Sequence, residues 1–371
     1  MYGFSALVAA STLAMAPPPF PIATTAVRME RGLMTWTAGT VRCEGGAVSP
    51  LGAMVRPMNA LAWSGNGSGG GGGPARIDFE IDASGRPVSI REAISGNQDL
   101  GPALAATRFP AAARSGCSVS YTPRMVPIAS AELADLVSYT LEPVSGALPA
   151  EGWSRIALLS GSTGDCMTSP RPQALSRAFP DFRKIPSTPG VKDWALVAYD
   201  LDGEGKPIHA RVALGTGNGT LESEAVAAVE RSRFTEGARQ ACRYPYWRTA
   251  GDVPAPVMPP AMPTSTSCPT KRAWAVPPAM RFPAGYERRR IEGWAIVGYD
   301  IAPWGAVGNV KVLQAQPSDA FGRQAVQMLQ GGSAAPLARG ATGCIARVKF
   351  VMTAPAAGAE ARAGEDTDTP F

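Results

Sequence analysis

Apolar and polar residues alternate in three widely separated stretches of the chain, and each stretch reverses at a short polar turn. In the clearest one, the apolar positions of 197–201 alternate, 202–205 supplies an Asp-Gly-Glu-Gly turn, and the alternation resumes at 208–212. A period of two on both sides of such a turn predicts a β-hairpin. The same pattern predicts hairpins over 77–90 and 296–312.

A segment with helical periodicity follows each hairpin, and a further apolar strand closes each stretch. The helices are predicted at 100–107, 221–232 and 320–329, and Thr220 is a candidate N-cap for the second. The closing strands are predicted to begin at a cysteine, over 117–121, 242–246 and 344–352. The order strand, strand, helix, strand predicts an α+β unit in which one helix covers a three-stranded antiparallel sheet.

Fixed offsets relate the three stretches to one another. A shift of 100 residues carries Trp194 onto Trp294, and a shift of 120 carries Asp202 back onto Asp82. Self-similarity of this kind indicates repeated units. The predicted copies are 40–125, with a glycine-rich insertion at 64–73, then 160–250 and 265–353.

Six cysteines divide in the same way, one early and one late in each copy. The pairs Cys43 and Cys117, Cys166 and Cys242, and Cys268 and Cys344 are separated by 74, 76 and 76 residues. Six cysteines allow fifteen connectivities, of which pairing within each copy fits the spacing best. Because structural disulfides persist in oxidising compartments, the cysteines favour a location outside the cytoplasm.

Both chain ends differ in composition from the predicted units. Residues 4–16 are apolar and uncharged and are followed by three prolines. Thirteen helical residues span about 20 Å, short of the roughly 30 Å hydrocarbon core, so 1–26 is predicted to be a signal peptide. No basic residue precedes Arg28, which leaves an uncleaved N-terminal segment as the alternative. The tail 354–371 has no packing signal and is predicted to be disordered.

Charge and candidate chemistry exclude several functional classes. The chain of 371 residues has a net charge of +5 without a dense basic block, so we expect no nucleic-acid partner. Its densest basic run, Arg288 to Arg290, is predicted to be a solvated face or linker in preference to a lipid or phosphate site. His209, the single histidine, is predicted to be exposed on a strand, and Asp82, Asp200, Asp202 and Asp300 are predicted to serve the hairpin turns. We therefore expect no enzyme activity, no metal and no cofactor.

The combination of motifs resembles a known family. A hairpin with an Asp-x-x-Gly turn, a Ser/Gly corner, an Ala-rich helix and a Phe-Pro-Ala segment before the last strand is similar to the C-terminal domain of TonB-type energy transducers. The matching stretches are 77–121, which contains Phe109-Pro110-Ala111, 194–246 and 294–351. From this resemblance, together with the repeat and the cysteine spacing, we predict three tandem small α+β domains of this kind, each with one disulfide, although three copies with disulfides are atypical of the family. The resemblance also implies a periplasmic domain that pairs by strand addition with a segment of an outer-membrane transporter.

We therefore predict a periplasmic protein-binding or scaffolding protein whose closing strands offer edges to an envelope protein. The candidate edge residues are Ser118, Tyr121, Arg243, Tyr246, Ile345, Arg347 and Lys349. The alternative is a TonB-like energy transducer for outer-membrane transport, anchored in the inner membrane by an uncleaved 4–16 segment. The chain lacks the long Pro-rich, charged spacer that the family's transducers have after the anchor.

Overall fold

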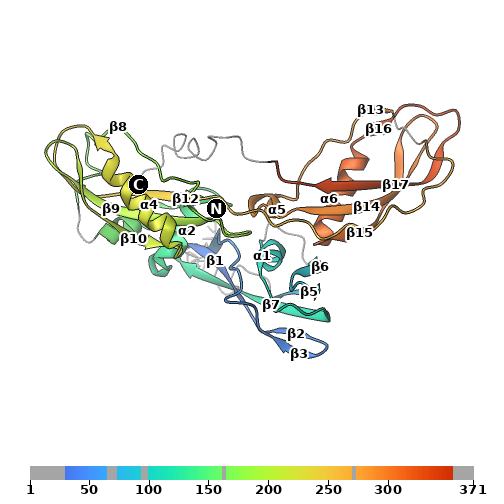
Figure 1. The fold of residues 1–371 in the computed structure, drawn as a ribbon, viewed down its shortest axis with the longest axis horizontal. Coiled ribbons are helices and arrows are strands. Elements are labelled where there is room, and N and C mark those ends of the chain that lie inside the picture. Colours follow the sequence, from blue (N-terminus) through green and yellow to red (C-terminus); the bar gives the residue numbers. More distant parts are fainter. Residues whose placement is uncertain (1–29, 65–72, 93–98, 161–163, 270–272, 354–371) are drawn as a thin grey trace, which may run out of the picture.

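The computed structural model describes residues 30–64, 73–92, 99–160, 164–269 and 273–353 (Figure 1). Within these ranges the chain is a mixed α+β fold with several small sheets and three disulfides. The predicted signal peptide 1–26, most of the 64–73 insertion and the predicted tail 354–371 lie outside the described residues. None of the described helices is long and apolar enough to cross a membrane.

The second sheet has the predicted order of elements. It consists of β9 (Asp193–Leu201), β10 (Pro207–Gly215) and β12 (Arg239–Arg248), and α4 (Gly219–Arg231) packs on one face. The strands lie antiparallel in the order β10-β9-β12, so the central strand is the first of the hairpin. Nearly every residue of β9 is buried, which shows that both faces of this sheet are covered.

The third sheet repeats that arrangement at the opposite end of the long axis (Figure 1). It consists of β14 (Gly293–Ile301), β15 (Val307–Gln316) and β17 (Ala341–Phe350), in the order β15-β14-β17, with α6 (Asp319–Gln330) on one face. The helix α6 begins where the 3.6-residue period predicts, and the Ser318 side chain caps its first turn. A short helix, α5 (Ala284–Arg288), precedes this sheet.

The first sheet is larger than the sequence pattern predicts. The strands β5 (Ala75–Ile81) and β6 (Pro87–Glu92), the helix α1 (Leu100–Ala106) and the strand β7 (Arg114–Pro127) follow the predicted order. However, β7 is 14 residues long and pairs with further strands on its other side, which makes a seven-stranded sheet. The added strands are β1 (Glu30–Ala38), β2 (Val41–Cys43), β3 (Gly46–Val48) and β4 (Ala60–Ser64).

Two helices that the sequence pattern does not predict cover the second face of the second sheet. These helices, α2 (Leu133–Leu141) and α3 (Ala150–Ala157), are flanked by the 3₁₀ turns η1 (Ile128–Ser130) and η2 (Leu158–Ser160). Side chains alternate across a strand, so Trp194 and Leu196 point away from α4. Both are buried in one apolar cluster with residues of α2 and α3. The remaining short strands are β8 (Ala174–Ser176) with β11 (Arg233–Phe234), and β13 (Trp274–Val276) with β16 (Ser333–Ala334).

A buried arginine joins the three sheets. Arg289 is 4% exposed and donates hydrogen bonds to the Asp99 carboxylate, which precedes α1, and to the carbonyl oxygens of Arg56 and Gly190. The acceptors belong to the first sheet's surroundings and to the loop before β9. The prediction that 288–290 is a solvated face is therefore wrong for Arg289, because its partners are brought together only by the tertiary fold.

The disulfides and the hairpin turns agree with the sequence. Cysteines pair within each predicted copy, as Cys43–Cys117, Cys166–Cys242 and Cys268–Cys344. In the second hairpin, Asp202 Oδ1 accepts from the N–H groups of Glu204 and Lys206, at 3.0 and 2.9 Å. The glycine that follows, Gly205, has a φ of +74°, a conformation that side chains with a Cβ rarely adopt. These contacts explain why the turn requires Asp and Gly three residues apart.

Candidate functional site

The closing strands differ in whether they offer a free edge. Among the described strands, β12 pairs only with β9, and β17 pairs only with β14. By contrast, β7 is paired on both sides. Ser118 lies opposite Asp78 of β5 and Arg42 of β2, and Tyr121 lies between β5 and β1. The expectation of a free edge at Ser118 and Tyr121 is therefore wrong, because N-terminal strands already fill that position.

The direction of the backbone groups in β12 follows from its register. The Trp194 carbonyl accepts from the Thr216 N–H, on the β10 side of β9. In an antiparallel sheet the N–H and C=O of one residue point to the same side and alternate along the strand. The backbone N–H and C=O of Leu196 therefore also point toward β10. Pro245 lies opposite Leu196, so its backbone carbonyl points outward, away from β9. Proline is tolerated there because an outward N–H is not needed by the sheet.

The same register places an arginine at the equivalent position of β17. Arg347 lies opposite Ile296, as Pro245 lies opposite Leu196. We infer that the N–H and C=O groups of Arg347 face outward, and that those of Lys349 do so next along the strand. An edge of this kind is a template for pairing with another extended chain. The β17 edge thus has a donor where the β12 edge has none.

Neighbouring segments also hold the side chains of β12. Arg243 donates to the Ala157 carbonyl at 3.2 Å, and Tyr246, which is 4% exposed, donates to the Ala178 carbonyl at 3.2 Å. Burial lowers the pKa of the Arg243 guanidinium and raises the pKa of the Tyr246 phenol. On β17, Arg347 and Lys349 are exposed and Ile345 is half-buried. The positively charged side chains of β17 therefore remain at the surface.

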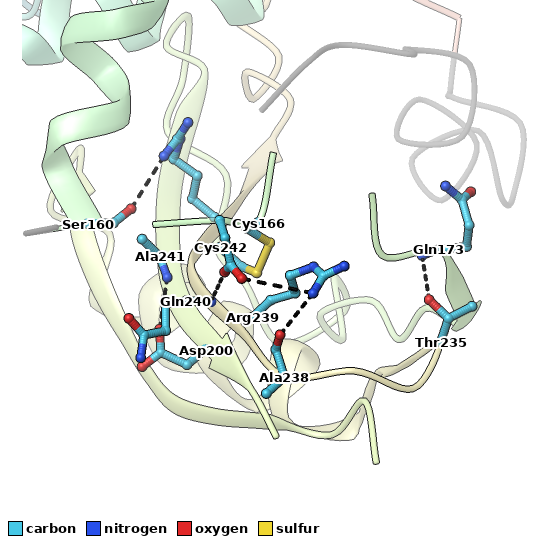
Figure 2. The surroundings of a disulfide bond; sticks show 12 residues. Ser160, Cys166, Gln173, Asp200, Thr235, Ala238, Arg239, Gln240, Ala241 and Cys242 are labelled. Carbon is cyan, nitrogen blue, oxygen red and sulfur yellow. Dashed lines mark hydrogen bonds and ion pairs between the residues drawn. A yellow bond between two sulfur atoms is a disulfide. The ribbon is translucent and has the colours of Figure 1, made fainter. Parts of the chain in front are cut away.

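Two aspartates position the start of the closing strands. Figure 2 shows Asp200 of β9 beside the Cys166–Cys242 disulfide, where its carboxylate accepts from the Ala241 N–H at 2.9 Å. In the third sheet, Asp300 accepts from the Gly343 N–H at 2.8 Å. The hydrogen bond from Asn309, together with that from Gly343, lowers the pKa of Asp300. The prediction that these two carboxylates serve the hairpin turns is therefore wrong. They hold the bulge next to the second cysteine of each unit.

One large cavity lies between the first and second sheets. It has a volume of about 640 Å³ and is lined by residues 53–59, by α2 and by the loops before β9 and after β10. Its charged side chains form pairs: Arg56 with Asp135 at 3.0 Å, and Lys192 with Glu142 at 3.1 Å. The buried Asp193 accepts from Thr188, Thr216 and Asn218. We assign no ligand to this cavity, because these charged groups are already engaged by other groups of the protein.

The remaining candidate for catalysis is the histidine. His209 is exposed, as expected, with 75% of its side chain accessible, and its Nδ1 lies 3.0 Å from an Asp200 carboxylate oxygen. In the part of the chain that the structure describes, no three His, Cys, Asp or Glu side chains are grouped to hold a metal ion.

The comparison with known families concerns the part of the chain that carries the β17 edge. Residues 278–352 match the family described as the Gram-negative bacterial TonB protein C-terminal. This range includes α5, the third sheet and α6, and ends just after β17. The chain has no match among curated proteins. Residues 278–352 are thus similar to the C-terminal domain of TonB proteins.

Proposed function

We propose that this chain is a periplasmic protein-binding or scaffolding protein that holds an extended segment of an envelope protein at the β17 edge. The observation that carries the proposal is that, among the described strands, β17 pairs only with β14 and has exposed Arg347 and Lys349 side chains, in a region similar to the TonB C-terminal domain. From the register we infer that the Arg347 backbone groups face outward. In strand addition, main-chain hydrogen bonds supply affinity and alternate side chains supply specificity. An outer-membrane transporter is the class of partner that the family suggests. The proposal includes no catalytic step and no cofactor.

We further propose that the first two predicted copies belong to the same family and serve as support. The order hairpin, helix, closing strand recurs in both. The β7 strand is paired on both sides, and β12 has Pro245 where a donor would face the partner. One chain would then present one binding edge, in place of the three edges that the repeat suggests.

Site-specific crosslinking tests the proposal. A photoreactive amino acid in place of Lys349 should capture an envelope protein in intact cells. The matched control is the same amino acid in place of Leu158 of η2, a residue that is 63% exposed and distant from β17 in the chain. Equal capture at the two positions would contradict the proposal.

The N-terminus separates this function from that of an anchored transducer. If the mature protein begins near Pro17 or Val27, the apolar 4–16 segment is removed and the chain is released into the periplasm. If it begins at Met1, the same β17 edge would work in an inner-membrane-anchored transducer. Sequencing the N-terminus of the mature protein distinguishes the two forms.

A further inference from the structure

The connector between the second and third sheets lies along β17. We call residues 254–267 the strap. Near the start of β17 the contacts come from Ser265 and Ser267, and near its end they come from Pro256 to Pro259. The strap therefore runs antiparallel to β17, which is one of the two directions that an added strand can take.

At the start of β17 the strap uses backbone groups of the strand. The Ser265 N–H donates to the Gly343 carbonyl at 3.3 Å. The Thr342 N–H donates to Ser267 Oγ, and Ser267 Oγ donates to the Thr342 carbonyl, both at 3.1 Å. These hydrogen bonds engage the backbone of β17 immediately before the proposed binding residues.

Further along, the strap crosses the sheet face that α6 leaves uncovered. Arg347 donates from Nη2 to the Pro259 carbonyl at 2.6 Å, and its Nε lies 3.1 Å from Met258 Sδ. Trp294 donates from Nε1 to the Pro256 carbonyl at 2.7 Å. Trp294 and Ile296 are 2% and 1% exposed. The strap thus holds the side chain of the central edge residue and helps to cover the apolar face beside it.

The strap is poorly suited to complete a β-ladder. It contains Pro254, Pro256, Pro259, Pro260 and Pro263, none of which has an N–H to donate. It also exposes apolar side chains, since Val257 is 93% and Met262 39% exposed. In the second sheet the equivalent face is covered by α2 and α3, whose Leu136 and Ile156 are fully buried. The cover of the second sheet is part of a core, whereas the strap is a surface segment.

We propose that the strap is a built-in competitor for the β17 edge, which an incoming extended segment displaces. This inference rests on the proposed function, because it describes how access to the same edge is regulated. A protein whose binding-competent form is only partly populated binds with an affinity reduced by that fraction. Releasing the strap therefore increases the affinity of the edge without adding a contact.

The test compares a strap-release variant with the full-length wild-type chain. Met258→Gly removes the sulfur contact with Arg347, and Ser265→Pro and Ser267→Ala remove the side-chain and N–H hydrogen bonds with Thr342 and Gly343. The hydrogen bond from Arg347 to the Pro259 carbonyl remains in this variant. Val257→Ala, in the same segment, is the matched control. Arg347→Ala weakens the strap from the β17 side and provides a second variant should the triple variant misfold. Hydrogen exchange of the Trp294 indole N–H, identified with Trp294→Phe, reports whether the strap has left the face.

A peptide of alternating Val and Glu serves as the probe, because its carboxylates complement Arg347 and Lys349. We expect faster indole exchange in both release variants and, for the triple variant, about tenfold tighter binding of the peptide. Unchanged indole exchange, or faster exchange with unchanged affinity for the peptide, would overturn the strap as a competitor. Faster exchange with no binding of the peptide to any variant would instead overturn strand addition at β17, on which the competition depends.

Discussion

Replacing the buried Arg289 should strongly destabilise the whole chain. Its guanidinium is buried and reaches three parts of the molecule: the Asp99 carboxylate at 2.8 Å, the Gly190 carbonyl at 2.9 Å and the Arg56 carbonyl at 2.9 Å. Replacing Arg289 with Met keeps the length of the side chain and removes its charge and all its hydrogen bonds. The Asp99 carboxylate, which is 4% exposed, then keeps the hydrogen bond from the Met58 N–H at 2.9 Å but has lost its positively charged partner.

The cost follows from the burial of the pair. Removing one member of a buried ion pair leaves the other charge desolvated and destabilises a protein by about 3–5 kcal/mol. We therefore expect Arg289→Met to lower the free energy of unfolding by that amount in urea titrations followed by tryptophan fluorescence without reductant. In the double variant with Asp99→Asn the loss should be smaller than the sum of the single losses, because the two groups interact directly.

Arg290→Met is the matched control. Arg290 is paired with Asp252, whose side chain is 50% exposed, and such pairs contribute about 1 kcal/mol or less. An Arg289→Met variant that unfolds within about 1 kcal/mol of the wild type would refute the reasoning, as would strictly additive losses in the double variant.

Three further perturbations test other parts of the structure. Burial, assisted by Asp319 and opposed by Arg323, raises the pKa of Glu92 to about 7, so the folded chain binds more protons than the unfolded chain between about pH 4.5 and 7. The free energy of unfolding should fall across that range by up to about 3 kcal/mol, and by less because the Glu92 side chain is partly exposed. In urea titrations at pH 5 and pH 8, Glu92→Gln should remove this fall. Gly305 has a φ of +95°, and Gly305→Ala would place a Cβ 2.1 Å from the Ala334 carbonyl oxygen. This change should lower the free energy of unfolding by about 2 kcal/mol or more. Gly308→Ala, with open space around it, should have a smaller effect in the same titration. Replacing Cys268 and Cys344 together with Ser should cost about 4 kcal/mol and make the third sheet the first part cleaved in limited proteolysis; wild-type resistance would contradict a stabilising role for this disulfide.

The local elements could be predicted from the sequence because their signals are local. Alternation around an Asp-x-x-Gly turn, a helical period and cysteines at a constant spacing gave the hairpins, the helices and the disulfide pairing. The N-cap of α4 shows the precision of such signals. The capping side chain is that of Asn218, which accepts from the Leu221 N–H, and the predicted cap Thr220 lies inside the helix. Two good capping residues stand close together, and the sequence does not rank them.

Long-range pairing could not be predicted in the same way. The strands β1 and β2 pair with β7 across many intervening residues, and nothing in the alternation of β7 shows that its second edge is filled. Arg289 lies 190 residues from Asp99, so its burial depends on the assembled fold. For the candidate site, the sequence pattern proposed Ile345, Arg347 and Lys349 but did not separate them from Ser118 and Tyr121, which lie on a strand paired on both sides. Pro245 was the readable signal that the β12 edge differs.

Strand addition at β17 can be tested by comparing how Arg347→Pro and Arg347→Ala bind the partner captured through Lys349, or the alternating Val and Glu peptide. Both variants lose the same side chain, and only proline also lacks the outward N–H; β12 shows that the sheet accepts proline at this register. With both variants folded, as judged by thermal melting, our account predicts that Arg347→Ala still binds and that Arg347→Pro binds at least about tenfold more weakly. Equal binding by the two variants would contradict strand addition at β17.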